Sequence, residues 1–153
     1  MTYRFATCGD CRQVHELICQ LEEKQLSYEV FSRIWNVQRS SPHYLCLVCE
    51  EDGHLLGMVN LRFEEQLHHD GRIAEITEMY VRPSLRSKGI GKALIQRAYA
   101  ISREKGCLQI EACCNQLRLQ AHRFYLREGM KNYHFKFTRN LQGNVPEENT
   151  LGV

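Results

Sequence analysis

A glycine-rich basic segment, residues 81–92, places the strongest constraint on how this chain can fold. It reads Val-Arg-Pro-Ser-Leu-Arg-Ser-Lys-Gly-Ile-Gly-Lys, between an apolar run (73–81) and a helix-patterned run (92–105). Pro83 cannot donate a hydrogen bond to a strand ladder, so it ends the strand. The two glycines let the backbone turn tightly and come close to a ligand. The segment therefore predicts a strand, a loop and a helix in succession.

The helix start after this loop is suited to binding a phosphate group. The first N–H groups of a helix have no partner within it, and the positive end of the helix dipole lies there. Arg86, Lys88 and Lys92 add full positive charges. The spacing excludes a Walker loop, and Leu at position 94 excludes the Gly-x-Gly-x-x-Gly dinucleotide fingerprint. What remains is the pattern Arg-x-x-Gly-x-Gly over residues 86–91.

Length and composition are those of one globular domain. The chain has 153 residues, of which 43% are hydrophobic and 25% charged, and its formal charge is +2. We expect a single domain over residues 1–141 and a polar, flexible tail over residues 142–153. No apolar run approaches the roughly 20 residues of a membrane helix, and no signal peptide opens the chain. We therefore expect a cytoplasmic protein without a membrane or nucleic-acid partner.

Eight cysteines include two Cys-x-x-Cys pairs, at residues 8 and 11 and at residues 46 and 49. Together these pairs mimic a zinc ribbon. The second pair falls in an expected strand, where residues three apart point to opposite faces, so one metal ion cannot easily bind both thiolates. Disulfides are rare in the expected reducing compartment. We favour cysteines that act as small buried hydrophobic residues.

The expected elements follow the order β-α-α-β-β-β-α-β-α-β. Strands are expected at residues 3–6, 44–49, 55–63, 73–81, 108–113 and 133–138, and helices after residue 10 and at 28–38, 92–105 and 119–128. A polar loop is expected over residues 64–72. This order predicts an α+β fold in which helices cover a mostly antiparallel sheet.

The phosphate loop and the element order resemble the GNAT superfamily of acetyl-CoA-dependent N-acetyltransferases. Residues 121–130, Ala-His-Arg-Phe-Tyr-Leu-Arg-Glu-Gly-Met, are similar to the superfamily's Ala-x-x-Phe-Tyr-x-x-x-Gly-Phe segment. Arg118 stands where the superfamily often has Asn, and the nearest Asn is Asn115. The resemblance implies three layers, with helices on both faces of a mixed sheet whose fourth and fifth strands splay apart.

Several segments look like the aminoalkylphosphonate N-acetyltransferases in particular. They are residues 16–19, 67–69, 75–78, 121–129 and 133–138. This resemblance implies direct transfer of the acetyl group of acetyl-CoA to a primary amine in a ternary complex, with a small aminoalkylphosphonate as the acceptor. The alternatives are a polyamine, an aminoglycoside, a protein lysine or N-terminus, or a non-catalytic acetyl-CoA-binding regulatory module. By analogy, residues 133–138 would supply an edge to a homodimer.

The resemblance also implies a cofactor site. The pantetheine arm would lie between the splayed strands and bond the backbone of Met79, Tyr80 and Val81. The pyrophosphate would lie on the loop formed by Arg86, Ser87, Lys88, Gly89, Ile90, Gly91 and Lys92. Asn115 and Phe124 are assigned to the same site, and Arg118 in place of the usual Asn puts the contacts of Asn115 in question.

Two acidic residues, Glu75 and Glu78, stand in an otherwise apolar strand. Burying a carboxylate there is costly unless it is partnered or used. Regular pleating would put the two on opposite faces, so they share a site only if the strand contains a bulge. By resemblance, we favour Glu75 as the general base and Glu78 as the acceptor-amine ligand or alternative base. The alternative is that one or both form a structural pair with Arg72, Arg62 or a basic residue of a helix.

The remaining candidates are a tyrosine and a polar loop. By resemblance, Tyr125 is the general acid for the leaving thiolate; the alternative is a core aromatic residue. His68 and His69 could bind a divalent metal, bind phosphonate as imidazolium or act as a base, or they could lie in a solvated loop. A phosphonate needs cationic donors, for which Arg72 is a candidate. The other candidates are Arg33, Arg62 and Arg123.

Overall fold

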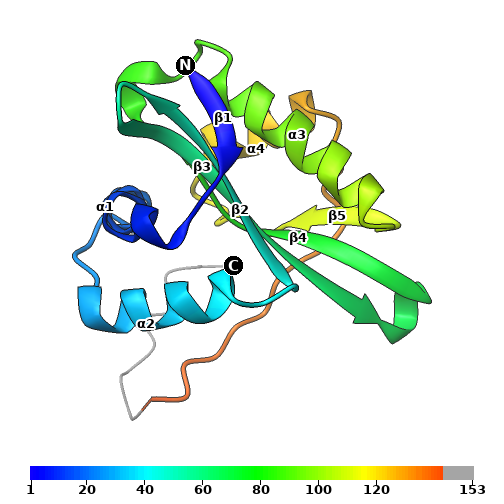
Figure 1. The fold of residues 1–153 in the computed structure, drawn as a ribbon. Coiled ribbons are helices and arrows are strands. Elements are labelled where there is room, and N and C mark those ends of the chain that lie inside the picture. The colour runs from blue at the N-terminus through cyan, green and yellow to red at the C-terminus, as the bar shows by residue number, and fades with distance from the viewer. Residues whose placement is uncertain (143–153) are drawn as a thin grey trace.

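A five-stranded sheet forms the centre of the molecule. In the computed structural model, which describes residues 1–142, the strands lie in chain order from β1 to β5 (Figure 1). They are β1 (Thr2–Phe5), β2 (Tyr44–Glu51), β3 (His54–Gln66), β4 (Gly71–Val81) and β5 (Gln109–Ala112). The first four pair antiparallel, and β5 pairs parallel to β4. The expected mixed, mostly antiparallel sheet is confirmed.

Helices cover both faces of this sheet. Helices α1 (Cys11–Glu22) and α2 (Tyr28–Arg39) lie on one face, and α3 (Ile90–Glu104) and α4 (Leu119–Arg127) lie on the other (Figure 1). Helix α1 buries Val14, Leu17 and Ile18, at the i, i+3, i+4 spacing of one helical face. The three-layer α+β architecture is confirmed.

The hairpin of β3 and β4 is longer than the sequence indicated. The ladder runs from Gly57 opposite Val81 to Gln66 opposite Gly71, and a 3-10 turn, Leu67–His69, joins the strands. The sequence predicted a loop over residues 64–72, which was wrong for most of that range. The outer part of the hairpin has exposed and half-buried polar side chains, so it lacks the apolar alternation that indicates a strand.

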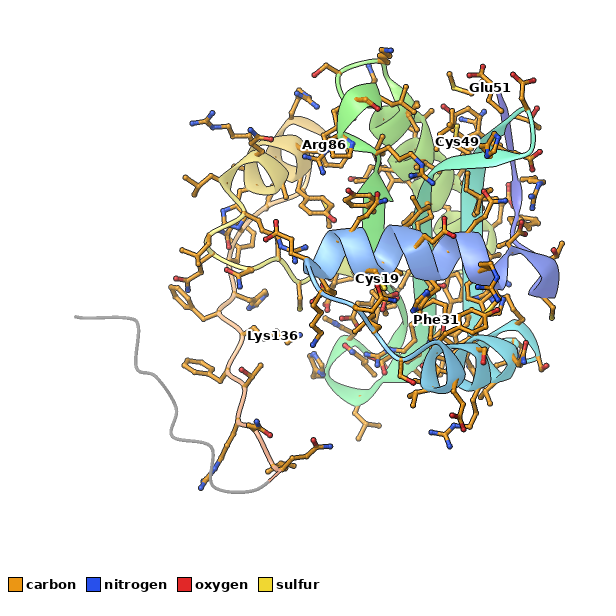
Figure 2. All side chains as sticks on the ribbon, turned by 90° about the vertical axis from the view of Figure 1, so that its left-hand side faces the viewer. Cys19, Phe31, Cys49, Glu51, Arg86 and Lys136 are labelled. Carbon is orange, nitrogen blue, oxygen red and sulfur yellow. The ribbon has the colours of Figure 1, made fainter. Side chains whose placement is uncertain are left out.

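The sixth expected strand, residues 133–138, does not form. The described residues from Lys131 onward have no helix or strand. An alternating pattern sets which side chains share a face, but a strand also needs a neighbouring strand to pair with. The chain leads away from the sheet here instead (Figure 2). The expected tail, 142–153, lies outside the described residues except for Gln142.

All eight cysteines are free. Cys46 packs in the core under α1, and Cys49 packs in the core under α3, so the two thiols lie on opposite faces of the sheet as expected. Burial raises the pKa of Cys46 to about 12. Among the helices between residues 1 and 142, none is both long and apolar enough to cross a bilayer.

Candidate active site

A bulge in β4 places Glu75 and Glu78 on the same face of the sheet. Glu75 lies opposite Arg62 of β3, and Glu78 lies opposite Asn60, with a register shift between the two pairs. Arg62 and Asn60 are two residues apart in one strand and so share a face. Thr77 is the extra residue in β4. The two carboxylates were expected to share a site only if the strand contained a bulge, and β4 contains one.

Glu75 forms an ion pair with Arg62, which was the alternative to a catalytic role in the sequence-based prediction. Its Oε2 accepts a hydrogen bond from Arg62 Nη2 at 2.5 Å, and its side chain is 19% exposed. On the other side, Glu75 lies opposite Glu111 of β5, so two carboxylates occupy adjacent strands on this face. Adjacent like charges favour a bound cation. This end of the face can therefore hold an ammonium group.

Glu78 has neutral partners instead. Its Oε2 accepts from Asn60 Nδ2 at 2.9 Å and from Thr77 Oγ1 at 2.5 Å. Asn60 is buried and connects this carboxylate to α2, because its Oδ1 accepts from Arg39 at 3.1 Å and its Nδ2 lies 3.0 Å from Gln38 Oε1. Asn60 is a residue of this site that was not predicted from the sequence. A lone amide inside the apolar run of β3 was the available signal.

Two arginines on this face retain unused donors. The Nε atoms of Arg39 and Arg62 are buried and have no hydrogen-bond partner among the described residues. Arg39 also stacks on the Trp35 ring, with the guanidinium carbon 4.4 Å from the ring centroid. Burial lowers the pKa of Arg39, although a guanidinium stays charged at neutral pH. Both side chains can bind an anionic group beside the carboxylates.

The pairing of β4 with β5 ends halfway along β4. The last paired residues are Ile76 and Ala112, while β4 continues to Val81. On this edge, Val81 O accepts from Arg86 Nε at 3.2 Å. The expected splay is confirmed, and the backbone of residues 77–81 lies along it. This is the part of β4 that contains Met79, Tyr80 and Val81.

The basic loop leads directly into α3. Gly89 has φ +85° and Ser87 has φ 63°, so both adopt the left-handed conformation. Helix α3 begins at Ile90, two residues before the expected start, and Gly89 offers no side-chain cap. The first backbone N–H groups of the helix are therefore free for an anion. The guanidinium carbon of Arg86, labelled in Figure 2, lies 5.5 Å from the centroid of the Tyr80 ring.

Helix α4 approaches the phosphate loop through Phe124. A Cβ atom on Gly91 would lie 3.3 Å from Phe124 Cε2, so glycine at 91 permits this contact. Phe124 and Tyr125 both pack against the core under α3, and burial raises the pKa of Tyr125 to about 12. Asn115 accepts from Leu117 N–H at 2.8 Å through its side chain. The structure thus brings Phe124 and Tyr125, but not the Asn115 amide, into contact with this core.

The histidine loop lies at the far end of the carboxylate face. His69 Nε2 is 3.1 Å from Gln109 Nε2 and 3.6 Å from Glu111 Oε1, while His68 is exposed. Arg72 pairs with Glu65 at 2.9 Å. Arg72 precedes Ala74 and Ile76 in β4 by two and four residues, so it lies on the same face as they do, the face covered by α3. Glu75 lies on the opposite face. Arg33 and Arg123 are exposed.

The ligands expected of a metal centre do not gather at this loop. Within residues 1–142 there is no group of three His, Cys, Asp or Glu residues that could hold a metal ion. His69 and Glu111 are two side chains of the kind that bind metals, but no third such side chain lies with them among the described residues.

Comparison with known proteins identifies the family. The sequence model of the Acetyltransferase (GNAT) family matches residues 11–130. The chain belongs to this family. This GNAT acetyltransferase is 37% identical over 138 residues to the aminoalkylphosphonate N-acetyltransferase of Salmonella typhimurium, and the match covers 90% of each chain. It is accordingly an N-acetyltransferase that uses acetyl-CoA.

Solved structures confirm the fold of this GNAT acetyltransferase. A transcriptional regulator from Bacillus halodurans C-125 has a TM-score of 0.84 at 23% identity, over 91% of this chain and 98% of that one. An aminoglycoside N-acetyltransferase in complex with CoA has a TM-score of 0.81 at 16% identity, over 92% and 94% of the two chains. At these identities the likeness extends to the fold alone.

Proposed function

We propose that this GNAT acetyltransferase acetylates the primary amine of a small aminoalkylphosphonate. The observation that carries the proposal is the face shared by Glu75, Glu78, Arg39 and Arg62, which combines carboxylates for an ammonium with guanidinium donors for an anion. A zwitterionic acceptor with its two charges a few bonds apart fits this combination. The likeness to the Salmonella typhimurium enzyme supports the same acceptor class.

The acceptor would lie with its amine between the two carboxylates and its phosphonate toward the arginines. Glu75 is already neutralised by Arg62, so in this proposal it positions the ammonium. Glu78, whose partners are neutral, accepts the proton. This exchanges the roles that the sequence favoured, because the Glu75 carboxylate is already occupied by the Arg62 guanidinium and is less available to take a proton.

In acetyl transfer, a carbon–nitrogen bond then forms and the carbon–sulfur bond of the thioester breaks. Glu78 first takes one proton from the bound ammonium, directly or through water, and the neutral amine nitrogen then attacks the thioester carbon. The second proton leaves nitrogen for solvent as the tetrahedral intermediate collapses. The developing oxyanion would accept hydrogen bonds from backbone N–H groups of residues 79–81. The carbon–sulfur bond then breaks, and Tyr125 donates its phenol proton to the departing thiolate. The pyrophosphate would bind residues 86–92.

The test is detection of acetylated products by mass spectrometry with acetyl-CoA and paired amines. We expect 2-aminoethylphosphonate to react at least about 100-fold faster, in kcat/KM, than ethylamine, which lacks the anion. A polyamine, an aminoglycoside and a lysine peptide complete the panel. Equal rates for the paired amines, or preference for the peptide or aminoglycoside, would contradict the proposal. Repeating the assay with chelator and with added divalent metal tests the metal prediction for His68 and His69.

Replacing Tyr125 by phenylalanine is expected to lower kcat about 100-fold, at the lower end of general-acid effects. Because burial raises the pKa of Tyr125 to about 12, the phenol stays protonated through the working pH range. The ratio of wild-type to variant kcat should therefore be constant between about pH 6 and pH 10. A ratio that falls as pH approaches 10 would contradict the assignment.

Tyr99→Phe is the matched control for this variant. Tyr99 lies on α3, burial raises its pKa, and its O–H donates to Glu128 O at 3.1 Å. The substitution removes one phenol hydroxyl beside the same core, at a residue to which no catalytic role is assigned. We expect its kcat to stay within about twofold of the wild type.

A cytoplasmic location and the lack of a nucleic-acid partner stay predictions.

A further inference from the structure

Arg118 joins the two helical layers of the molecule. It lies directly before α4, and its Nη2 donates to Leu21 O, in the last turn of α1, at 2.9 Å. The same nitrogen lies 3.4 Å from Glu22 Oε1. Helices α1 and α4 lie on opposite faces of the sheet (Figure 1). The side chain of Arg118 therefore connects the two faces.

The connection passes across the splay between β4 and β5. These strands pair only as far as Ile76 and Ala112, and Arg118 follows β5 after a short loop. On the other side of the splay, α1 packs over Tyr80, in the part of β4 that has no β5 partner. Figure 2 shows the loop before α4 beside the C-terminal end of α1. Arg118 thus spans the opening from the β5 side to the β4 side.

The bond to Leu21 is the main part of this connection. Leu21 O is among the last four carbonyls of α1, which have no partner within the helix and carry the negative end of its dipole. A guanidinium N–H satisfies this carbonyl with a charge-assisted hydrogen bond. The Glu22 pair adds less, because its two side chains are 40% and 45% exposed. One bond of this kind can open and close without unfolding either helix.

Arg118 also lies close to the end of the splay where the thioester is proposed to react. Burial raises the pKa of Tyr125 to about 12 and raises the pKa of the Cys114 thiol, and the positive charge of Arg118 opposes both increases. Such an effect requires that the guanidinium lie near both groups. Tyr125 is the proposed acid for the departing thiolate. The same side chain therefore borders the splay at its reactive end and holds α1 over it.

We propose that Arg118 is a positioning residue that closes the splay over the pantetheine arm of acetyl-CoA. This inference rests on the proposed function, which places the arm along the backbone of residues 79–81. With the arm in the splay, β4 and β5 flank it, and the bond from Arg118 to Leu21 O crosses it on the α1 side. Closure slows the departure of the cofactor and keeps its thioester beside Tyr125 and the N–H groups of residues 79–81.

The test compares the binding of CoA with that of ADP, which has the adenosine and the pyrophosphate of CoA but lacks the pantetheine arm. In Arg118→Ala we expect the Kd for CoA to rise about tenfold, mainly through faster dissociation, because one charge-assisted hydrogen bond is lost. The Kd for ADP should stay within about twofold of the wild type. Isothermal titration calorimetry with the full-length chain gives both affinities, and stopped-flow displacement gives the dissociation rate.

Three further variants separate the connection from general effects of the substitution. Arg118→Lys should regain most of the CoA affinity, because an ammonium can also donate to Leu21 O. Glu22→Arg leaves Arg118 in place but repels it, and should raise the Kd for CoA at least about threefold. Arg97→Ala is the matched control, because Arg97 is exposed on α3 and its Nη1 donates to a backbone carbonyl, Ala93 O, at 3.2 Å. It should leave both affinities unchanged.

Two results would overturn the proposal. Unchanged CoA affinity in both Arg118→Ala and Glu22→Arg would mean that the connection does not hold the arm. An equal loss of CoA and ADP affinity would mean that the substitution disturbs the phosphate loop or the fold, which circular dichroism would distinguish. Because neither titration includes an amine, both results are independent of which acceptor is acetylated. A failure of the phosphonate assignment would appear only in the product assay.

Discussion

Replacing Glu78 by glutamine is expected to lower kcat for 2-aminoethylphosphonate about 100- to 1,000-fold, in the range of general-base effects. Glutamine keeps an oxygen that can accept from Asn60 Nδ2 and Thr77 Oγ1, so the site should stay intact, and KM should rise by no more than about tenfold from the loss of one charged partner of the amine. Without the base, the ammonium must lose its proton to solvent before it attacks. Variant kcat should therefore rise with pH between about pH 6 and pH 10, which steady-state kinetics would measure.

Glu75→Gln is the matched control, since it removes one carboxylate from the same face. It should mainly raise KM for the acceptor, about tenfold, because the amine loses a charged partner and Arg62 retains only Glu64, at 3.4 Å. If Glu75→Gln instead causes the large, pH-dependent loss of kcat, Glu75 is the base that the sequence favoured. A small effect of both substitutions would mean that the amine is deprotonated without either carboxylate.

The sequence was sufficient where local patterns determine structure. The phosphate loop lies between β4 and α3 as predicted, because proline, glycine and helix periodicity act within a few residues of each other. Residues three apart in a strand point to opposite faces, and this correctly predicted that the thiols of Cys46 and Cys49 lie on opposite faces of the sheet. These predictions needed no knowledge of which strands are neighbours.

The carboxylate site could be predicted only conditionally. Whether Glu75 and Glu78 share a face depends on one extra residue in β4, and a bulge is a property of the pairing between β3 and β4. The same pairing brings Arg62 to Glu75 and Asn60 to Glu78. Register between strands is set by long-range packing, which a single strand's pattern does not contain.

Replacing Gly89 by alanine is expected to raise the Kd for acetyl-CoA about 10- to 100-fold, while leaving the chain folded. Gly89 has φ +85°, which costs an L-residue roughly 1–2 kcal/mol. Relief of that strain would turn the free N–H groups at the start of α3 away from the pyrophosphate. Losing one hydrogen bond to a charged group costs about 1.5–3 kcal/mol. Isothermal titration calorimetry with CoA gives the affinity without turnover.

Gly53→Ala separates cofactor binding from backbone strain. Gly53 has φ +77°, and an added Cβ would meet nothing within 4 Å, as at Gly89. It lies in the turn between β2 and β3, away from the splay. Both variants should lose similar unfolding free energy in urea, but only Gly89→Ala should lose affinity for CoA. Equal loss of affinity in the two would assign the effect to general destabilisation. Unchanged affinity in Gly89→Ala would mean that the pyrophosphate binds elsewhere than at the start of α3.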